Sequence, residues 1–201
     1  MIRVLIADDQ ALVRGALSAL LNLEDDIEVV CEVGRGYEVM TAVRTHRPDV
    51  ALIDIEMPGQ DGIAVTQEIT DAQLSTRALI VTTFGRPGYV HRALSAGAYG
   101  FVVKDTPAQE LAQAIRQVHA GNRVVDPVLA TQSLFEGVNP LTEREQEILR
   151  VAANGATIAE IARHVYLSEG TVRNHLSSVI GKTGAETRAQ AAVIARERGW
   201  L

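Results

Sequence analysis

The sequence is poor in cysteine and has no long apolar run. Cys31 is the single cysteine, so no internal disulfide can form, and its place in the run IEVVCEV is typical of a small buried residue. No apolar run approaches the roughly 20 residues that a membrane-spanning helix needs. The N-terminal MIRVLIADDQ meets acid at Asp8, before the apolar segment of a signal peptide could form. We therefore expect a cytoplasmic protein with no membrane partner.

An excess of basic residues is also missing. Residues 1–137 contain 11 Lys and Arg against 18 Asp and Glu, a net charge of −7, whereas residues 138–201 contain 8 against 7, a net charge of +1. The first part should repel nucleic acid, and the second permits its approach. With 201 residues, 47% of them hydrophobic, the chain can form one sizeable core and a smaller one. The sequence therefore predicts two domains of different character.

Short apolar runs alternate with amphipathic stretches through residue 120. The apolar runs at 2–8, 27–33, 49–54, 77–83 and 99–104 indicate buried strands. Helical spacing occupies 11–22, 36–46, 62–70, 88–97 and 107–121. This alternation predicts an α/β fold, a doubly wound five-stranded parallel sheet with helices on both faces. Right-handed crossovers then place every loop that follows a strand at one edge of the sheet.

Prolines and glycines break this rhythm at residues 121–137, which we interpret as a linker with a short helix around 127–136. The predicted domains are therefore 1–120 and 138–201. After Pro140 the sequence is helical throughout, and Thr142 with Glu145 three residues later has the pattern of a capping box. Helices over 157–165 and 169–182, joined by a short turn, predict a small all-α helix-turn-helix domain.

Acidic residues end two of the predicted strands, at the edge where ligands of such sheets bind. Asp8 and Asp9 follow the first strand and Asp54 ends the third, while Thr82 ends the fourth and Lys104 the fifth. Each residue alone is more often a helix cap, a surface lysine or ordinary strand filler. Together they predict a Mg²⁺ site, since hard oxygen ligands with few protein donors suit that ion. Asp54 is then placed to attack a phosphoryl group whose other oxygens Lys104 and Thr82 hold.

The segments IADD, DIEMPGQDG, VTT and AGAYGFVVKD resemble the receiver domain of two-component response regulators, which has a flavodoxin-like fold. The resemblance covers residues 1–120 and implies that a sensor histidine kinase phosphorylates Asp54. It also implies a Mg²⁺ cofactor held by Asp8, Asp9, Asp54 and the main-chain carbonyl of Glu56, catalytic roles for Asp54, Thr82 and Lys104, and a switch formed by Thr82 and Phe101. Many receivers have proline directly after the lysine, whereas this chain has Asp105.

The helix predicted at 169–182 has an apolar and a polar face. Val172, Leu176, Val179 and Ile180 share the apolar face, and Arg173, Asn174, Ser177 and Lys182 lie on the polar one. Arginine and asparagine can read guanine and adenine in the major groove, although a helical bundle for protein contacts stays compatible with the near-neutral charge. Residues 138–201 resemble the DNA-binding domain of the NarL/FixJ (LuxR-type) class. The resemblance implies double-stranded promoter DNA as a partner, base contacts by Arg173, Asn174 and Ser177, and phosphate contacts by Thr171 and Lys182.

A net charge of +1 gives one such domain few phosphate contacts, so we expect two domains on two half-sites. Helix 11–22 supports a dimer, because its apolar residues spread over about 200° of the helix, more than one core requires. Tolerance of alanine on a surface helix is the plain alternative. Whole-chain similarity to DesR-type regulators of membrane-lipid desaturation implies a homodimer on phosphorylation, through the first and fifth helices. Leu12, Val13 and Ala16 would then pack against Leu111 and Ala112 of a second copy.

Two other functions stay open on the sequence alone. A haloacid-dehalogenase-type phosphohydrolase also phosphorylates a strand-end aspartate, but that class has Asp-x-Asp at the nucleophile, where this chain has Asp54-Ile55-Glu56. A DNA-binding or adaptor protein that ignores phosphorylation would retain its function after Asp54→Ala. We expect no enzyme activity beyond self-phosphorylation and self-dephosphorylation. Loss of the phosphoryl group should be slow, because bulky Phe84 stands where an attacking water would be held.

Overall fold

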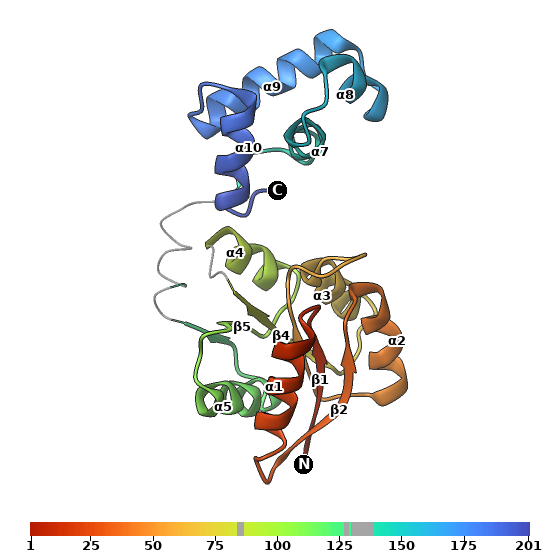
Figure 1. Ribbon diagram of the computed structural model, residues 1–201, viewed down its shortest axis with the longest axis vertical. Helices are drawn as coiled ribbons and strands as arrows, with labels where there is room; N and C mark the ends of the chain where they lie inside the picture. The colour runs from red at the N-terminus through yellow and green to blue at the C-terminus, as the bar shows by residue number, and fades with distance from the viewer. Residues whose placement is uncertain (84–86, 127–128, 130–138) are drawn as a thin grey trace. The chain divides into compact units, whose positions relative to one another are not determined.

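The computed structural model describes residues 1–83, 87–126, 129 and 139–201 (Figure 1). The chain divides into two compact units, an N-terminal unit built on a sheet and a C-terminal unit built from helices. The two units match the predicted number of domains. The predicted domain boundaries, at residues 120 and 138, remain predictions. Among the described residues, every helix is too short or too polar to span a bilayer.

The N-terminal unit is a parallel sheet with helices on both faces, as the sequence predicts. Its strands are β1 (Ile2–Ala7), β2 (Ile27–Val33), β3 (Val50–Ile53), β4 (Arg77–Thr82), β5 (Gly100–Val103) and β6 (Val124–Val125). They lie in the order β2-β1-β3-β4-β5-β6, and each neighbouring pair is parallel. The helices are α1 (Ala11–Leu21), α2 (Gly36–His46), α3 (Gly62–Asp71), α4 (Pro87–Ser95) and α5 (Ala108–His119). Helix α1 contacts α5 on one face, and α2 contacts α3 on the other (Figure 1).

The sheet has six strands, one more than the sequence predicts. Strand β6 lies in the predicted linker and pairs with β5 through Gly100 and Phe101, and the Val124 amide donates to the Tyr99 carbonyl at 2.9 Å. Two residues are too few to show a period of two, so this strand carries no readable sequence pattern. The short helix predicted at 127–136 lies outside the described residues, apart from Leu129.

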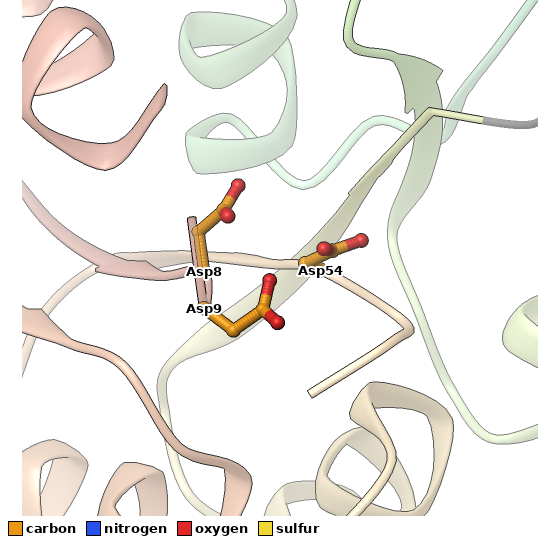
Figure 2. A group of neighbouring side chains, drawn as sticks. All are labelled: Asp8, Asp9 and Asp54. Atoms are coloured by element: carbon orange, nitrogen blue, oxygen red, sulfur yellow. The ribbon is translucent and has the colours of Figure 1, made fainter. Parts of the chain in front are cut away.

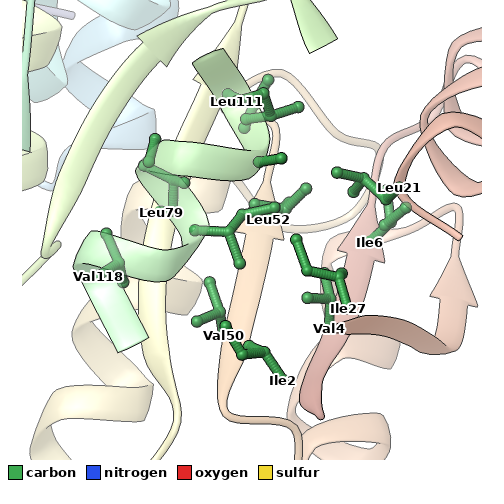
Figure 3. Close-up of a cluster of buried hydrophobic side chains, with 14 of the residues drawn as sticks. Ile2, Val4, Ile6, Leu21, Ile27, Val50, Leu52, Leu79, Leu111 and Val118 are labelled. Atoms are coloured by element: carbon green, nitrogen blue, oxygen red, sulfur yellow. The ribbon is translucent and has the colours of Figure 1, made fainter. Parts of the chain in front are cut away.

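The core of this unit fixes where the strands end. Residues 50–53 of β3 are at most 1% exposed, and so are residues 4–7 of β1. Figure 3 shows Val4, Ile6, Val50 and Leu52 from these segments in one cluster with Leu21 of α1 and with Leu111 and Val118 of α5. Because such strands are covered on both faces, a charged residue fits only where the strand leaves the core. Asp8 and Asp54 stand directly after these two buried segments.

The C-terminal unit contains α7 (Glu143–Ala153), α8 (Ile158–His164), α9 (Glu169–Thr183) and α10 (Arg188–Glu197). Each of these helices is preceded by a hydroxyl side chain that accepts a hydrogen bond from a main-chain amide of the first turn. In chain order, these capping residues are Thr142, Thr157, Ser168 and Thr187. The predicted capping box of Thr142 and Glu145 is confirmed. The core includes Ile148, Leu149, Ile161, Val172, Leu176, Val179 and Trp200. Helices α8 and α9 form the predicted helix-turn-helix.

Candidate functional site

Three carboxylates gather at the carboxyl edge of the sheet. Asp8 and Asp9 follow β1 and Asp54 follows β3, and these strands are direct neighbours, so the side chains come together (Figure 2). One carboxylate oxygen of each lies within 4.8 Å of the others. Asp8 is 2% and Asp54 4% exposed, while Asp9 faces solvent. Two buried carboxylates this close repel each other unless a cation offsets their charge.

Lys104 provides a cation between the two buried carboxylates. Its Nζ lies 2.7 Å from Asp8 Oδ2 and 2.8 Å from Asp54 Oδ2. Burial alone would lower the pKa of Lys104, but the hydrogen bonds to Asp54 and Asp8 outweigh burial and raise it. Burial raises the pKa of Asp54, and the hydrogen bond from Lys104 opposes that rise. The lysine predicted for this site is therefore in direct contact with the predicted phosphoacceptor.

A small hollow of about 130 Å³ opens beside Asp54 and is lined by Asp9, Gln10, Asp54, Glu56, Thr82 and Thr83. Thr82, the last residue of β4, is 4% exposed. The predicted switch aromatic Phe101 is fully buried in β5, one strand away from this hollow. The Lys104–Asp105 peptide bond is trans, since the described residues contain no cis peptide. Phe84 lies outside the described residues.

Two residues that the sequence reasoning missed hold the loops of the site. Arg14 of α1 donates from Nη1 to the main-chain carbonyl of Asp8 at 2.5 Å and so fixes the turn that carries Asp8. A Cβ on Gly62, at the start of α3, would lie 2.0 Å from the Asp54 carbonyl oxygen, so only glycine fits there. The DIEMPGQDG motif contains this glycine, but a motif does not show what the glycine touches.

The carboxylate cluster fits the predicted divalent cation. Asp8, Asp9 and Asp54 offer hard oxygen ligands on two adjacent loops, and the Glu56 loop lines the same hollow. Such a donor set of few protein oxygens beside open solvent suits Mg²⁺, which keeps several waters. Lys104 alone balances only one of the two buried charges. The residues present therefore have room and charge for one such ion.

Helix α9 presents the residues predicted to contact DNA. Arg173, Asn174 and Ser177 are exposed. Arg173 donates to Glu169 one turn earlier at 2.8 Å, a surface pair of the kind that contributes little to stability. Thr171 is half-buried, and its hydroxyl lies 2.8 Å from that of Ser168 at the start of the helix. These four residues lie within the first three turns of α9.

Lys182 is placed differently from the others. Its Nζ donates to Oε2 of Glu145 in α7 at 2.6 Å. Glu145 is 4% exposed and lies against the core of the C-terminal unit. The lysine predicted to touch DNA phosphate is thus bound to an acidic side chain of its own domain.

Of the residues predicted for the dimer surface, those on α1 are accessible, whereas those on α5 are buried. Leu12 is 86% exposed, Ala16 is exposed and Val13 is half-buried. Leu111 and Ala112 are 3% and 0% exposed, because they pack into the sheet's own core. They cannot touch a second copy without unfolding, so any partner contact of α5 must use its other face.

Comparisons with known proteins agree with this geometry. The response regulator receiver domain matches residues 4–116, and the luxR family of bacterial regulatory proteins matches residues 139–195. The chain is 46% identical to the transcriptional regulatory protein YvfU and 43% identical to the transcriptional regulatory protein DesR, both of Bacillus subtilis (strain 168). Each match spans 201 residues, the full length of both chains.

A solved structure supports the same assignment. The crystal structure of ChrA, a response regulator of a heme-sensing two-component system, matches with a TM-score of 0.59 and 33% identity, over 100% of this chain and 98% of that chain. The match to the receiver domain family covers more than half of the chain, and the matches to YvfU and DesR cover all of it. The chain therefore belongs to the LuxR-type (NarL/FixJ) family of response regulators, and it is a transcriptional regulator with a receiver domain and a DNA-binding domain.

Proposed function

We propose that this regulator is switched by phosphorylation of Asp54. A sensor histidine kinase supplies the phosphoryl group, Mg²⁺ assists, the receiver dimerises, and the C-terminal unit binds promoter DNA. The observation that carries this proposal is the contact of Lys104 with both Asp8 and Asp54, the second of which also lines the hollow. Positioning and charge neutralisation are most of what phosphoryl transfer requires, and this cluster offers both.

The transfer step uses groups that the structure brings together. A carboxylate oxygen of Asp54 attacks the phosphorus of a phosphohistidine, an O–P bond forms and the P–N bond breaks. The electron pair stays on the imidazole nitrogen, which then takes a proton from solvent. The Lys104 ammonium and the Thr82 hydroxyl, both at the same edge, are placed to hold the oxygens of the transferred group. The phosphoryl group would fill the hollow beside Asp54.

Mg²⁺ is the cofactor that we propose for this site. Asp8, Asp9 and Asp54 would hold it by their side chains and Glu56 by its main-chain carbonyl. When bound, the ion neutralises charge between the acids and the incoming phosphoryl group. No hydrolysis of outside substrates is expected, so the protein is not an enzyme beyond its own phosphorylation and dephosphorylation. We place its action in the cytoplasm, where its DNA partner lies.

DNA binding is assigned to the exposed face of α9. Arg173, Asn174 and Ser177 would contact bases, and Thr171, beside the helix N-terminus, a phosphate. A domain with a net charge of +1 needs a second copy to gain affinity. The exposed Leu12 on α1 supports a receiver dimer through α1 and the polar face of α5. Genes of membrane-lipid desaturation are a candidate target on the resemblance to DesR.

The proposal is tested by incubating the full chain with Mg²⁺ and acetyl phosphate. Intact mass and light-scattering mass are then recorded together for the wild type, for Asp54→Ala and for Asp25→Asn. Asp25 is an exposed acid outside the site and serves as the matched control. We expect one phosphoryl group and a dimer for the wild type and the control, and neither for Asp54→Ala.

Other outcomes favour the other functions. Wild-type protein that gains no phosphoryl group and still binds DNA overturns the switch. Turnover on small phosphoesters, absent in Asp54→Ala, would favour a phosphohydrolase. Unchanged DNA binding by Asp54→Ala, with or without acetyl phosphate, would favour a regulator that ignores phosphorylation.

A further inference from the structure

Glu145 is a buried carboxylate of the C-terminal unit, and three donors surround it. Lys182 Nζ donates to Oε2 at 2.6 Å and Ser178 Oγ donates to Oε1 at 2.7 Å, both from α9. The Thr142 amide donates to Oε2 at 2.7 Å and closes the capping box at the start of α7. An ordinary capping box satisfies only its own helix. Here one carboxylate begins α7 and also holds the second half of α9.

The hydrogen bonds of Glu145 to Lys182 and Ser178 help to hold α9 in position. Burial alone would raise the pKa of Glu145, but the hydrogen bonds from Lys182, Ser178 and Thr142 outweigh burial and hold the pKa at about 2. Hydrogen bonds to charged groups are shorter and stronger than neutral ones. An acid held this far below its ordinary pKa stays ionised, so the contact persists at any physiological pH.

The angular position of Lys182 around α9 also supports a contact with α7. At 100° per residue, Lys182 lies about 180° around α9 from Arg173 and about 140° from Ser177. Ser178 and Lys182 are one turn apart and share the flank of α9 that meets α7. Arg173 and Ser177 lie on a different part of the helix surface, whereas Asn174 lies about 80° from Lys182 and one turn before Ser178. Lys182 therefore reaches Glu145 and points away from Arg173 and Ser177.

The preceding residue of α7 holds the turn that leads into α9. Arg144 donates from its guanidinium to the main-chain carbonyl of Val165. Val165 ends α8, and the turn that follows passes through Tyr166, whose φ is +55°, before Ser168 caps α9. A tyrosine in the left-handed region is strained, so the turn needs support from its neighbours. The first turn of α7 thus touches both the entry and the later half of α9.

We propose that Glu145 is a positioning residue for DNA recognition, and that Lys182 acts through Glu145 to orient α9 instead of binding phosphate. The proposal rests on the DNA binding assigned to α9 above. It changes the expected role of Lys182, which the family resemblance places at the DNA backbone. Tilting or sliding α9 within its unit would move Arg173, Asn174 and Ser177 together, so the loss should appear in base discrimination.

Salt dependence separates the two roles of Lys182. Each phosphate that a protein neutralises contributes about −0.9 to the slope of log K against log salt concentration. A lysine that touches phosphate should therefore make the slope about 0.9 shallower for each domain on DNA when it is replaced by an uncharged residue. A lysine that only orients α9 should leave the slope unchanged and lower the affinity at every salt concentration.

The experiment uses the full chain treated with Mg²⁺ and acetyl phosphate. The probes are a duplex that the wild type enriches from a random-sequence pool and an unrelated duplex of equal length. Binding is measured over a series of salt concentrations for Glu145→Gln, Lys182→Gln, the double variant and Ser178→Ala. Arg150→Gln is the matched control, because Arg150 is an exposed cation of α7 that contacts neither α9 nor Glu145. Circular dichroism confirms that each variant is folded at the temperature used.

We expect Glu145→Gln and Lys182→Gln each to weaken binding to the enriched duplex about tenfold, at an unchanged salt slope. Binding to the unrelated duplex should change little, so discrimination falls. The double variant should lose no more than either single variant, because both remove the same contact. Ser178→Ala should show a smaller loss of the same kind, which tests the idea even if Glu145→Gln unfolds.

Two results would overturn the proposal, and they are distinguishable. A salt slope shallower by about 0.9 per domain in Lys182→Gln, with full affinity in Glu145→Gln, would return Lys182 to the DNA backbone. A wild type that enriches no duplex at all would remove the DNA-binding assignment itself and this proposal with it.

Discussion

Acid should unfold the C-terminal unit through the titration of Glu145. The pKa of this carboxyl is about 2 in the folded chain, against an ordinary value of 4.5. Because the folded pKa is the lower one, the unfolded chain takes up the proton first as the pH falls. The contribution of Glu145 to the free energy of unfolding is therefore complete above about pH 4.5 and is lost as the pH falls to about 2.

The size of this contribution follows from the two pKa values. One pH unit between them corresponds to about 1.4 kcal/mol, so the step from 4.5 to about 2 corresponds to about 3 kcal/mol. Glu145 is only 4% exposed, so screening by solvent removes little of this. A domain of ordinary stability has about 5–15 kcal/mol in total. Loss of this one contact should therefore be visible in any unfolding curve.

Trp200 makes the measurement specific to the right unit. It is the single tryptophan of the chain, it is 5% exposed, and it lies in the core of the C-terminal unit. Urea unfolding followed by its fluorescence should give Glu145→Gln about 3 kcal/mol less stability than the wild type at pH 7, because glutamine resembles the protonated acid. The difference should shrink below pH 4.5 and approach zero near pH 2.

A matched control removes the same charge from the same turn. Glu143 begins α7 and is exposed, so Glu143→Gln should shift stability by at most about 0.5 kcal/mol at every pH. If the wild type and Glu145→Gln instead differ by a constant amount from pH 7 to pH 3, the reasoning about the buried carboxylate is refuted.

Four further predictions concern the N-terminal unit. Lys104→Met should destabilise the metal-free receiver by about 3 kcal/mol, since it leaves two buried carboxylates without their cation, and Mg²⁺ should restore part of the loss, as thermal unfolding with and without chelator would show. Leu12→Lys should weaken dimerisation of the phosphorylated protein on the order of hundredfold in sedimentation experiments, with the folding stability unchanged because the side chain is 86% exposed. Gly62→Ala should slow phosphorylation by acetyl phosphate about tenfold, since its Cβ would displace the carbonyl of the phosphoacceptor, whereas Gly15→Ala, whose Cβ meets nothing within 4 Å, should leave that rate unchanged. Phe84→Asn should speed loss of the phosphoryl group, measured by mass over time, and an unchanged decay would remove the water-exclusion argument.

Local patterns carry most of what the sequence predicts correctly. An apolar run of four residues followed by an acid fixes both the β3 strand and the place of Asp54, because the core tolerates no charge inside the strand. Thr142 with Glu145 predicts the start of α7, because the two residues of a capping box contact each other within one helical turn. Such features depend on neighbours in the chain and need no knowledge of the fold.

Features that depend on distant residues were missed or placed wrongly. The apolar side of α5 was assigned to a partner, but Leu111 and Ala112 are used by the core of their own unit. A hydrophobic pattern shows which residues seek cover, and it does not show what covers them. Lys182 and Glu145 stand 37 residues apart, and nothing in either local segment predicts that they meet. The Lys104 contact, 50 residues from Asp54, was reached through the common sheet edge and the family resemblance.

The two-residue strand β6 has a mechanical consequence. It lies at the start of the segment that leads to the DNA-binding unit, and a tension applied along that segment would reach Val125 and then Val124 before any other strand of the sheet. Val124 is held by the hydrogen bond from its amide to the Tyr99 carbonyl and by pairing with β5, the strand that contains Phe101 and ends next to Lys104. Peeling this strand would break the hydrogen bond of the Val124 amide and expose that amide to solvent. The rate at which the Val124 amide proton exchanges with solvent would therefore report on any tension that reaches the receiver along this segment.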